Sequence, residues 1–301
     1  MQTSIPASAR VLLAGAVDYA GLFPPAALGM PEAVAEYLRG RASEGRWALG
    51  RFVAPASRLE EFGSAARAAG VLSSDDPIAL SALIGADAAA DHLAIEQFNR
   101  THHPLGAVVD AVEGRAATAP AATELATRFA GPFACWVEVP LDGALPAVLD
   151  ALVGTGAGPK IRMGGVVASG FPSADQVVQF LVEVLRRGLP YKATAGLHHP
   201  VRGDYRLTYA PDSASGTMHG YLNLLLATAL LQSGGTAEQA RALLLLTPDV
   251  APPRLDEDGA TWGAHRFSLE ALQQARQAGM QAFGSCSFRE PLSDLEQVMA
   301  A

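Results

Sequence analysis

Residues 159–196, PKIRMGGVVASGFPSADQVVQFLVEVLRRGLPYKATAG, contain two short apolar runs separated by one amphipathic stretch. The runs Pro159–Met163 and Pro190–Ala195 are typical of buried strands. Between them, Ala174–Arg187 carries apolar residues at helical spacing, and Ser173 begins a capping-box sequence just before it. The order strand, helix, strand predicts one unit of a parallel α/β fold.

The same alternation extends outward over the rest of the chain. Successive strand-like runs begin about 26 to 37 residues apart up to the seventh, which is close to the length of one βα unit. Eight such runs predict a single (β/α)8-barrel (TIM-barrel) domain over residues 1–301, with a long insertion between strands 7 and 8. The predicted strands are Val11–Tyr19, Ala48–Val53, Ile78–Ile84, Gly106–Ala111, Phe133–Val139, Pro159–Met163, Pro190–Ala195 and Gln281–Phe288.

Helix-start signals agree with this pattern. Four segments have the spacing of a capping box: Ser57-x-x-Glu60, Ser173-x-x-Gln176, Thr236-x-x-Gln239 and Ser293-x-x-Glu296. An open doubly wound sheet would use the same alternation of elements. It is disfavoured because no G-x-G-x-x-G sequence follows the first run, and no cofactor is predicted.

Composition excludes several classes of function. The chain is 50% hydrophobic and has a net charge of −8 with scattered arginines, which disfavours nucleic-acid and membrane-surface binding. The longest apolar stretch, Leu224–Leu231, is far shorter than a membrane span, and Val11–Val17 reads as a strand rather than a signal peptide. Cys135 and Cys286 show neither zinc-ligand nor disulfide spacing, so a cytoplasmic protein is expected.

Only two lysines, Lys160 and Lys192, occur in the chain, and both lie in predicted strands. Unlike arginine, lysine can lose its proton and act as an amine nucleophile. Strand alternation directs Lys160 with Arg162, and Lys192 with Thr194, into the barrel. If the two amines share one interior, mutual repulsion and desolvation lower a lysine pKa. The alternative is that each lysine is an interior cation neutralised by Asp18, Asp110 or Glu138.

The segment Lys192-Ala193-Thr194-Ala195-Gly196 resembles the lysine strand of class I, Schiff-base aldolases such as deoxyribose-phosphate aldolase. That family keeps a second lysine on a neighbouring strand, a role that Lys160 matches. The two lysine strands occur here in the opposite order, so the resemblance leaves either lysine as the nucleophile. More broadly, the chain resembles a bacterial family of (β/α)8-barrel proteins whose activity is uncharacterised.

Histidines follow the second lysine strand. His198 and His199 are candidate general acids or bases, because barrel enzymes collect catalytic side chains at the carboxyl ends of their strands. Alternatively they make only loop contacts. His219 ends an excursion, 203–216, that is predicted either as a lid with glycine hinges or as a fixed loop. A divalent-metal site is a further possibility, with the ligands His198, His199, His219, Asp18 and Glu290.

Several residues are candidates for holding a substrate anion. Ser285 and Ser287 after the last strand, with Gly164 and Gly165 after the sixth, form a predicted phosphate or carboxylate site; the alternative is tight packing at a barrel corner. Cys286 between the serines is expected to be a buried small hydrophobe, because no sequence neighbour activates it.

Charged residues near the barrel mouth complete the set of candidates. Asp18 is expected to orient a lysine or the substrate. Arg51, Glu138 and Arg162 are inward or rim charges, and Arg162 can hold a substrate carboxylate in a bidentate pair. Each of them can equally be an ion-pair partner only.

Together these features predict a lyase of the class I aldolase type that acts on a small anionic substrate, an oxo acid or a sugar-like molecule, through a lysine Schiff base. One alternative is an enolate-forming isomerase or lyase that uses the lysines with or without a divalent metal. Another is a non-catalytic small-molecule-binding barrel. The apolar helix predicted at Tyr221–Leu231 belongs to the core or to a subunit interface, so a homo-oligomer remains possible.

Overall fold

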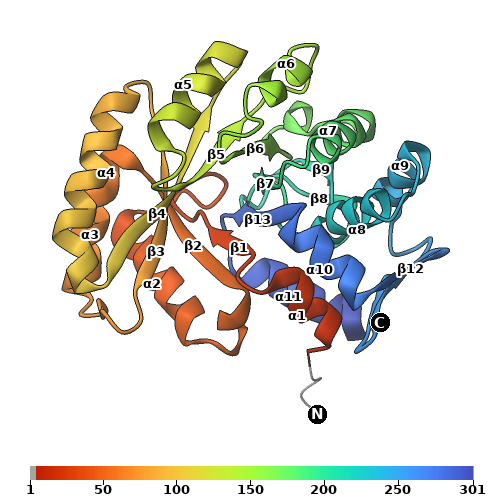
Figure 1. Cartoon of the computed structure of the whole chain (residues 1–301). Helices are drawn as coiled ribbons and strands as arrows, with labels where there is room; N and C mark the ends of the chain where they lie inside the picture. The colour runs from red at the N-terminus through yellow and green to blue at the C-terminus, as the bar shows by residue number, and fades with distance from the viewer. Residues whose placement is uncertain (1–4, 301) are drawn as a thin grey trace.

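The computed structural model describes residues 5–300 and consists of a closed parallel barrel surrounded by helices (Figure 1). Around the barrel the strands run in the order β1, β13, β7, β6, β5, β4, β3, β2. The predicted (β/α)8-barrel fold is therefore confirmed. The eight strands are β1 (Val17–Tyr19), β2 (Leu49–Pro55), β3 (Ile78–Leu83), β4 (Ala107–Arg115), β5 (Ala134–Glu138), β6 (Ala157–Arg162), β7 (Tyr191–Thr194) and β13 (Met280–Ser285).

Apart from α8, the helices are buried on one side and exposed on the other. In α7, for example, Val177, Leu181 and Val184 lie on the buried face at a spacing of three to four residues. The helices are α1 (Ala7–Leu13), α2 (Met30–Ala42), α3 (Leu59–Ala68), α4 (Ala88–His102), α5 (Ala119–Phe129), α6 (Leu145–Asp150), α7 (Ala174–Arg186), α8 (Tyr221–Gln232), α9 (Ala237–Leu245), α10 (Leu269–Gln277) and α11 (Arg289–Ala300).

The expected insertion lies between β7 and β13. It starts with an antiparallel hairpin of β8 (Gly203–Arg206) and β9 (Ser215–Met218), which covers the excursion 203–216. After α8 and α9 comes a small antiparallel sheet of β10 (Arg254–Leu255), β11 (Gly259–Trp262) and β12 (His265–Ser268). The hairpin is thus ordered structure beside the barrel mouth, rather than an irregular loop.

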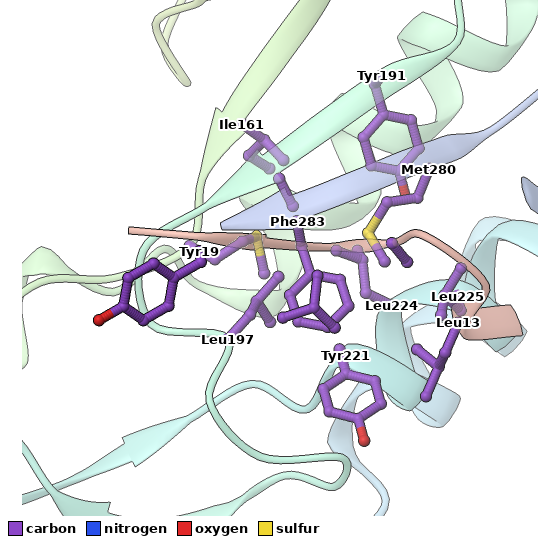
Figure 2. Packing of buried hydrophobic residues seen from close by; sticks show 14 of the residues in the cluster. Leu13, Tyr19, Ile161, Tyr191, Leu197, Tyr221, Leu224, Leu225, Met280 and Phe283 are labelled. Atoms are coloured by element: carbon purple, nitrogen blue, oxygen red, sulfur yellow. The ribbon is translucent and has the colours of Figure 1, made fainter. Parts of the chain in front are cut away.

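Helix α8 is part of the core. Every residue from Tyr221 to Leu230 is buried within this one chain. The ring of Tyr221 stacks on Phe283 of β13, with centroids 5.0 Å apart, and Figure 2 shows Leu224 packed in the same cluster. The burial of α8 needs no second subunit, because the barrel and its neighbouring helices cover all sides.

The first predicted strand is wrong over most of its length. The run Val11–Tyr19 was expected to be one strand, but helix α1 extends to Leu13 and only Val17–Tyr19 forms β1. Ser8, Leu12 and other buried residues of α1 have helical spacing, and Gly15 at φ +60° turns the chain between the two elements.

Two of the four predicted capping boxes form. Ser173 with Gln176, and Thr236 with Gln239, form both reciprocal bonds. Ser57 instead lies in a 3₁₀ turn before α3, and Ser293 lies inside α11, where its hydroxyl donates to the Glu290 carbonyl. The S-x-x-E spacing alone does not fix a helix start, because no side chain caps α3 and Ser293 bonds the backbone from inside its helix.

Candidate functional site

The two lysines lie side by side in the barrel interior, because Lys160 of β6 and Lys192 of β7 are register partners. Lys192 is 1% exposed and donates to two carboxylates, Asp18 of β1 and Glu113 of β4. The distance from its Nζ to Glu113 Oε1 is 2.7 Å. Lys192 therefore sits in a sealed ion cluster that joins opposite sides of the barrel.

Lys160 completes this cluster on its other side. Its Nζ lies 3.1 Å from Glu113 Oε2 and 3.3 Å from Glu138 Oε2 of β5. Ser81 of β3 donates to Glu113 at 2.7 Å, so both oxygens of that carboxylate are satisfied. We name Asp18, Glu113, Glu138, Lys160 and Lys192 the lysine–carboxylate network; it holds three acids and two amines.

The network corrects the expected electrostatics of the lysines. Mutual repulsion was predicted to lower a lysine pKa, but for Lys192 the prediction is wrong. Although burial favours the neutral amine, Asp18 and Glu113 raise the pKa of Lys192 above its ordinary value. The same lysines lower the pKa of Glu113 against the effect of its burial. Carboxylates between the amines replace repulsion by attraction.

Glu113 is the central residue that the sequence prediction missed. The fourth strand was predicted to end at Ala111, but β4 continues to Arg115. An irregularity in the pairing of β3 with β4, between Leu80 and Ser81, also shifts the register at this point. The apolar pattern stops where the interior of the barrel becomes charged, so an apolar-run criterion ends the strand too early.

A cavity of ≈ 290 Å³ opens above the network at the carboxyl ends of the strands. We name it the central cavity. Lys160 and Glu113 form part of its wall, together with Arg162, His198 and Cys286; Lys192 does not line it. The remaining lining residues are mostly small or apolar: Ala20, Phe23, Pro24, Val53, Leu83, Gly165, Val166, Thr194, Ala195 and Gly284.

Glu138 connects the network to the rim of the cavity. Its carboxylate accepts from Arg162 at 2.9 Å and from Arg115 at 2.6 Å. Although burial opposes ionisation, Lys160 and these arginines lower the pKa of Glu138 to about 2. The Arg162 side chain is 46% exposed, so its guanidinium can contact both Glu138 and a molecule in the cavity.

Both candidate histidines carry carboxylate partners from α11. His198 Nδ1 lies 3.1 Å from Glu290, and His199 Nδ1 lies 2.6 Å from Asp294. Although burial opposes protonation, hydrogen bonds to Cys286 and Glu290 raise the pKa of His198 to about 9. Burial lowers the pKa of His199. Of the two, only His198 lines the central cavity.

Cys286 has a neighbour that the sequence does not reveal. Its Sγ lies 3.8 Å from His198 Nδ1 and 3.4 Å from the hydroxyl of Tyr209, at the tip of the β8–β9 hairpin. Tyr209 also donates to Glu290 at 3.1 Å. The thiol is buried, as expected, and its histidine neighbour is distant in the sequence, because the segment after β13 and the loop after β7 bring the two together.

Other predicted site residues lie apart from the central cavity. Arg51 pairs with Asp110 at 2.6 Å, among residues at the amino ends of the strands. His219 bonds the Pro172 carbonyl at 2.8 Å and lines no part of the central cavity. The alternative in which Asp110 neutralises a lysine is therefore not found.

The predicted anion site does not assemble in one place. Gly164 is pressed against Gly196, where an added Cβ would come within 2.9 Å of the Gly196 Cα. Ser285 is buried beside His198, whereas Ser287 caps α11 by accepting from the Glu290 N–H at 3.1 Å. Only Gly165 of the four lines the central cavity. Two of these glycines and serines thus make tight packing and capping contacts.

Searches over residues 5–300 returned two negative findings. No group of three or more His, Cys, Asp or Glu side chains in this range is arranged to hold a metal ion, so the five residues named as an alternative metal site do not converge. No helix in the same range is both long and apolar enough to cross a bilayer.

Comparison with known proteins adds little to this picture. No protein-family model and no curated protein sequence matches the chain. Among solved structures, the chain is similar to a lysine decarboxylase from Selenomonas ruminantium, with a TM-score of 0.36 and 15% identity. The alignment covers 92% of this chain but 57% of that protein, so the chain spans little more than half of its length.

Proposed function

We propose that the protein is a lyase of the class I aldolase type that forms a Schiff base between Lys160 and a small oxo acid. The observation that carries this proposal is the position of Lys160 in the wall of the central cavity, beside Arg162 and His198. Lys192 lies behind it, sealed and doubly paired, and acts as a fixed positive charge. Lys160 is therefore the proposed nucleophile, because it is the lysine that a molecule in the central cavity can reach.

Lys160 must lose a proton before its amine can act as a nucleophile, and we propose that substrate binding triggers this transfer. In the resting state Glu138 is held ionised by Lys160 and Arg162. When Arg162 turns to a substrate carboxylate, Glu138 loses a partner and its pKa rises, so it can accept a proton from Lys160. The neutral amine then attacks the carbonyl carbon; a C–N bond forms and the carbonyl oxygen leaves as water.

Carbon–carbon cleavage follows from the iminium formed in that step. A base removes the proton of the hydroxyl on the β-carbon, the electron pair of the Cα–Cβ bond moves to the iminium, and an aldehyde is released. His198 faces the cavity and is paired with Glu290, so in its neutral form, which prevails above its pKa of about 9, it is the residue proposed to take this proton. Hydrolysis of the remaining enamine returns the amine of Lys160.

The test is borohydride reduction in the presence of small oxo acids and aldehydes, followed by intact-mass and peptide analysis. We expect an adduct on Lys160 in the wild type, its loss in Lys160→Met, and its retention in folded Lys192→Met. The double variant measures background from the N-terminal amine, because the chain has no other lysine. No adduct across the panel, or an adduct confined to Lys192, would refute the proposal.

A second candidate function is favoured by the raised pKa of Lys192. A protonated Lys160 in the cavity wall, with the positive charge of Lys192 behind it, would stabilise an enolate without any covalent bond to the amine. This mechanism predicts deuterium exchange at the carbon next to the carbonyl in wild-type protein that forms no borohydride adduct. Exchange together with an adduct on Lys160 would instead support the Schiff base.

A further inference from the structure

A second, larger cavity lies on the other side of Cys286. It has a volume of ≈ 540 Å³ and lies between the ends of β1 and β13, helix α2 and the start of α11. We name it the lateral cavity. Cys286 lines both cavities, so the two adjoin at this side chain. The charged residues of its wall are Glu36, Arg39 and Arg289.

Arg289 is placed where a cation is unfavourable unless an anion joins it. It is the first residue of the twelve-residue helix α11, whose amino end carries a partial positive charge. Within residues 5–300 it makes no ion pair. Arg39 adds a second guanidinium to the wall, and its pair with Glu36 at 2.5 Å neutralises the one acid there.

Tyr19 provides an independent sign of a ligand. The side chain lines the lateral cavity and is 2% exposed, yet its hydroxyl has no hydrogen-bond partner among the described residues. Tyr37 and Phe52 pack against the ring at 6.0 and 5.7 Å, and an added Cβ at Gly21 would lie 2.1 Å from the hydroxyl oxygen. In Figure 2 the phenol points out of the hydrophobic cluster.

The protonation of Tyr19 suits an anion. Burial raises the pKa of Tyr19, so the phenol keeps its proton and is available as a donor. Buried hydroxyls are rarely left without a partner in folded proteins. A guanidinium, a helix amino end and an unpartnered phenol therefore converge on one cavity, and all three favour an oxygen anion.

We propose that the lateral cavity binds a phosphate monoester group through Arg289, Tyr19 and the amino end of α11, with Arg39 adding positive charge. Resting on the proposed function, this assigns as substrate a phosphorylated oxo compound whose carbonyl reaches Lys160 past Cys286. The site shares only Ser287 with the one predicted by sequence: Ser287 lines the lateral cavity and caps α11, and neither Gly164 nor Gly165 is involved.

Calorimetric titration with inorganic phosphate at constant ionic strength tests the site. We expect saturable binding to the wild type and affinity weaker by about tenfold or more in Arg289→Gln. Tyr19→Phe, which keeps the packed ring, should bind several-fold more weakly. Arg266→Gln is the matched control, because Arg266 is an exposed arginine of β12 without an ion pair in the described chain. It should bind like the wild type.

Two further titrations test whether the lateral cavity prefers phosphate to a carboxylate and whether it binds independently of Lys160. Acetate should bind at least about tenfold more weakly than phosphate, and equal affinity would overturn the assignment to a phosphate ester. Lys160→Met should bind phosphate as the wild type does. No saturable binding in the wild type, or equal affinity in Arg289→Gln and Arg266→Gln, would overturn the inference.

The two proposals can fail separately. Adducts on Lys160 without phosphate binding would leave the Schiff base and remove the lateral site. Phosphate binding lost in Arg289→Gln, without any adduct, would do the reverse.

Discussion

The centre and the rim of the barrel mouth both pair bases with acids, but they do so in different ways. At the centre, Lys192 and Glu113 are 1% and 2% exposed and come from strands. At the rim, His198 and Glu290 come from a loop and the start of α11, and the Glu290 side chain is 28% exposed. The centre therefore has fixed geometry and fixed charge, whereas the rim has groups that can change charge.

The difference follows from the residues used at each place. Lysine and glutamate titrate far from neutral pH, and their mutual attraction moves both pKa values further away. An ordinary histidine titrates close to neutral pH, and hydrogen bonds to Cys286 and Glu290 raise the pKa of His198 to about 9 although its burial opposes protonation. A barrel with both arrangements can keep a constant field around Lys160 while His198 gains and loses protons.

The largest expected effect comes from breaking the centre. Glu113→Gln keeps the shape of the side chain but leaves Lys192 with Asp18 alone and Lys160 with Glu138 alone. Removing one partner of a buried ion cluster typically costs about 3–5 kcal/mol. We expect a loss of that size in the free energy of unfolding, measured by urea titration at pH 7.

The control for this prediction is Glu61→Gln, which removes an exposed partner of Arg58 on α3. Exposed pairs contribute little, so a change within about 0.5 kcal/mol is expected. If Glu113→Gln were as mild as this control, the central acid would not hold the lysines together.

A smaller effect is expected from the rim, and it depends on pH. The pKa of His198 is about 9 in the folded protein, compared with an ordinary value of about 6.5. Its contribution to stability is therefore fully present below pH 6.5 and is lost as pH rises towards 9, by up to about 3 kcal/mol. Urea unfolding at several pH values in this window measures the loss.

Two variants separate this effect from other titrations. His198→Gln should remove most of the decline between pH 6.5 and 9. His265→Gln, which changes a half-buried histidine of β12, should keep it. A decline of the same size in His198→Gln would assign it to another group. The centre should not contribute in this window, because the Glu138 pKa is about 2 and that of Lys192 lies above its ordinary value.

The same contrast explains what could be predicted from the sequence. Lys160 and Lys192 were found because lysine is scarce and because alternation along a strand fixes direction. Their partner Glu113 was not found, because its strand outlasts its apolar run. The pairing of Cys286 with His198 joins residues 88 positions apart across a loop, and no local pattern encodes such a contact.

The smallest expected effect concerns the β8–β9 hairpin at the rim. Tyr209→Phe removes the hydroxyl that bonds Cys286 and Glu290, and the side chain is 53% exposed, so the stability change should stay below about 1 kcal/mol. The rate of Cys286 alkylation by iodoacetamide should nevertheless rise several-fold, because the hairpin tip no longer covers the thiol. Cys135 serves as an internal reference, because burial raises its pKa to about 12 and keeps it unreactive.

Tyr205→Phe is the matched control for the hairpin. Tyr205 stacks on His199 with centroids 3.5 Å apart, and its hydroxyl donates to the Val201 carbonyl rather than to the thiol. Its loss should leave the alkylation rate of Cys286 unchanged. If both variants raised the rate equally, general loosening of the hairpin would control access to Cys286. If only Tyr209→Phe does so, the Tyr209 hydroxyl controls access to Cys286, the side chain that lines both the central and the lateral cavity.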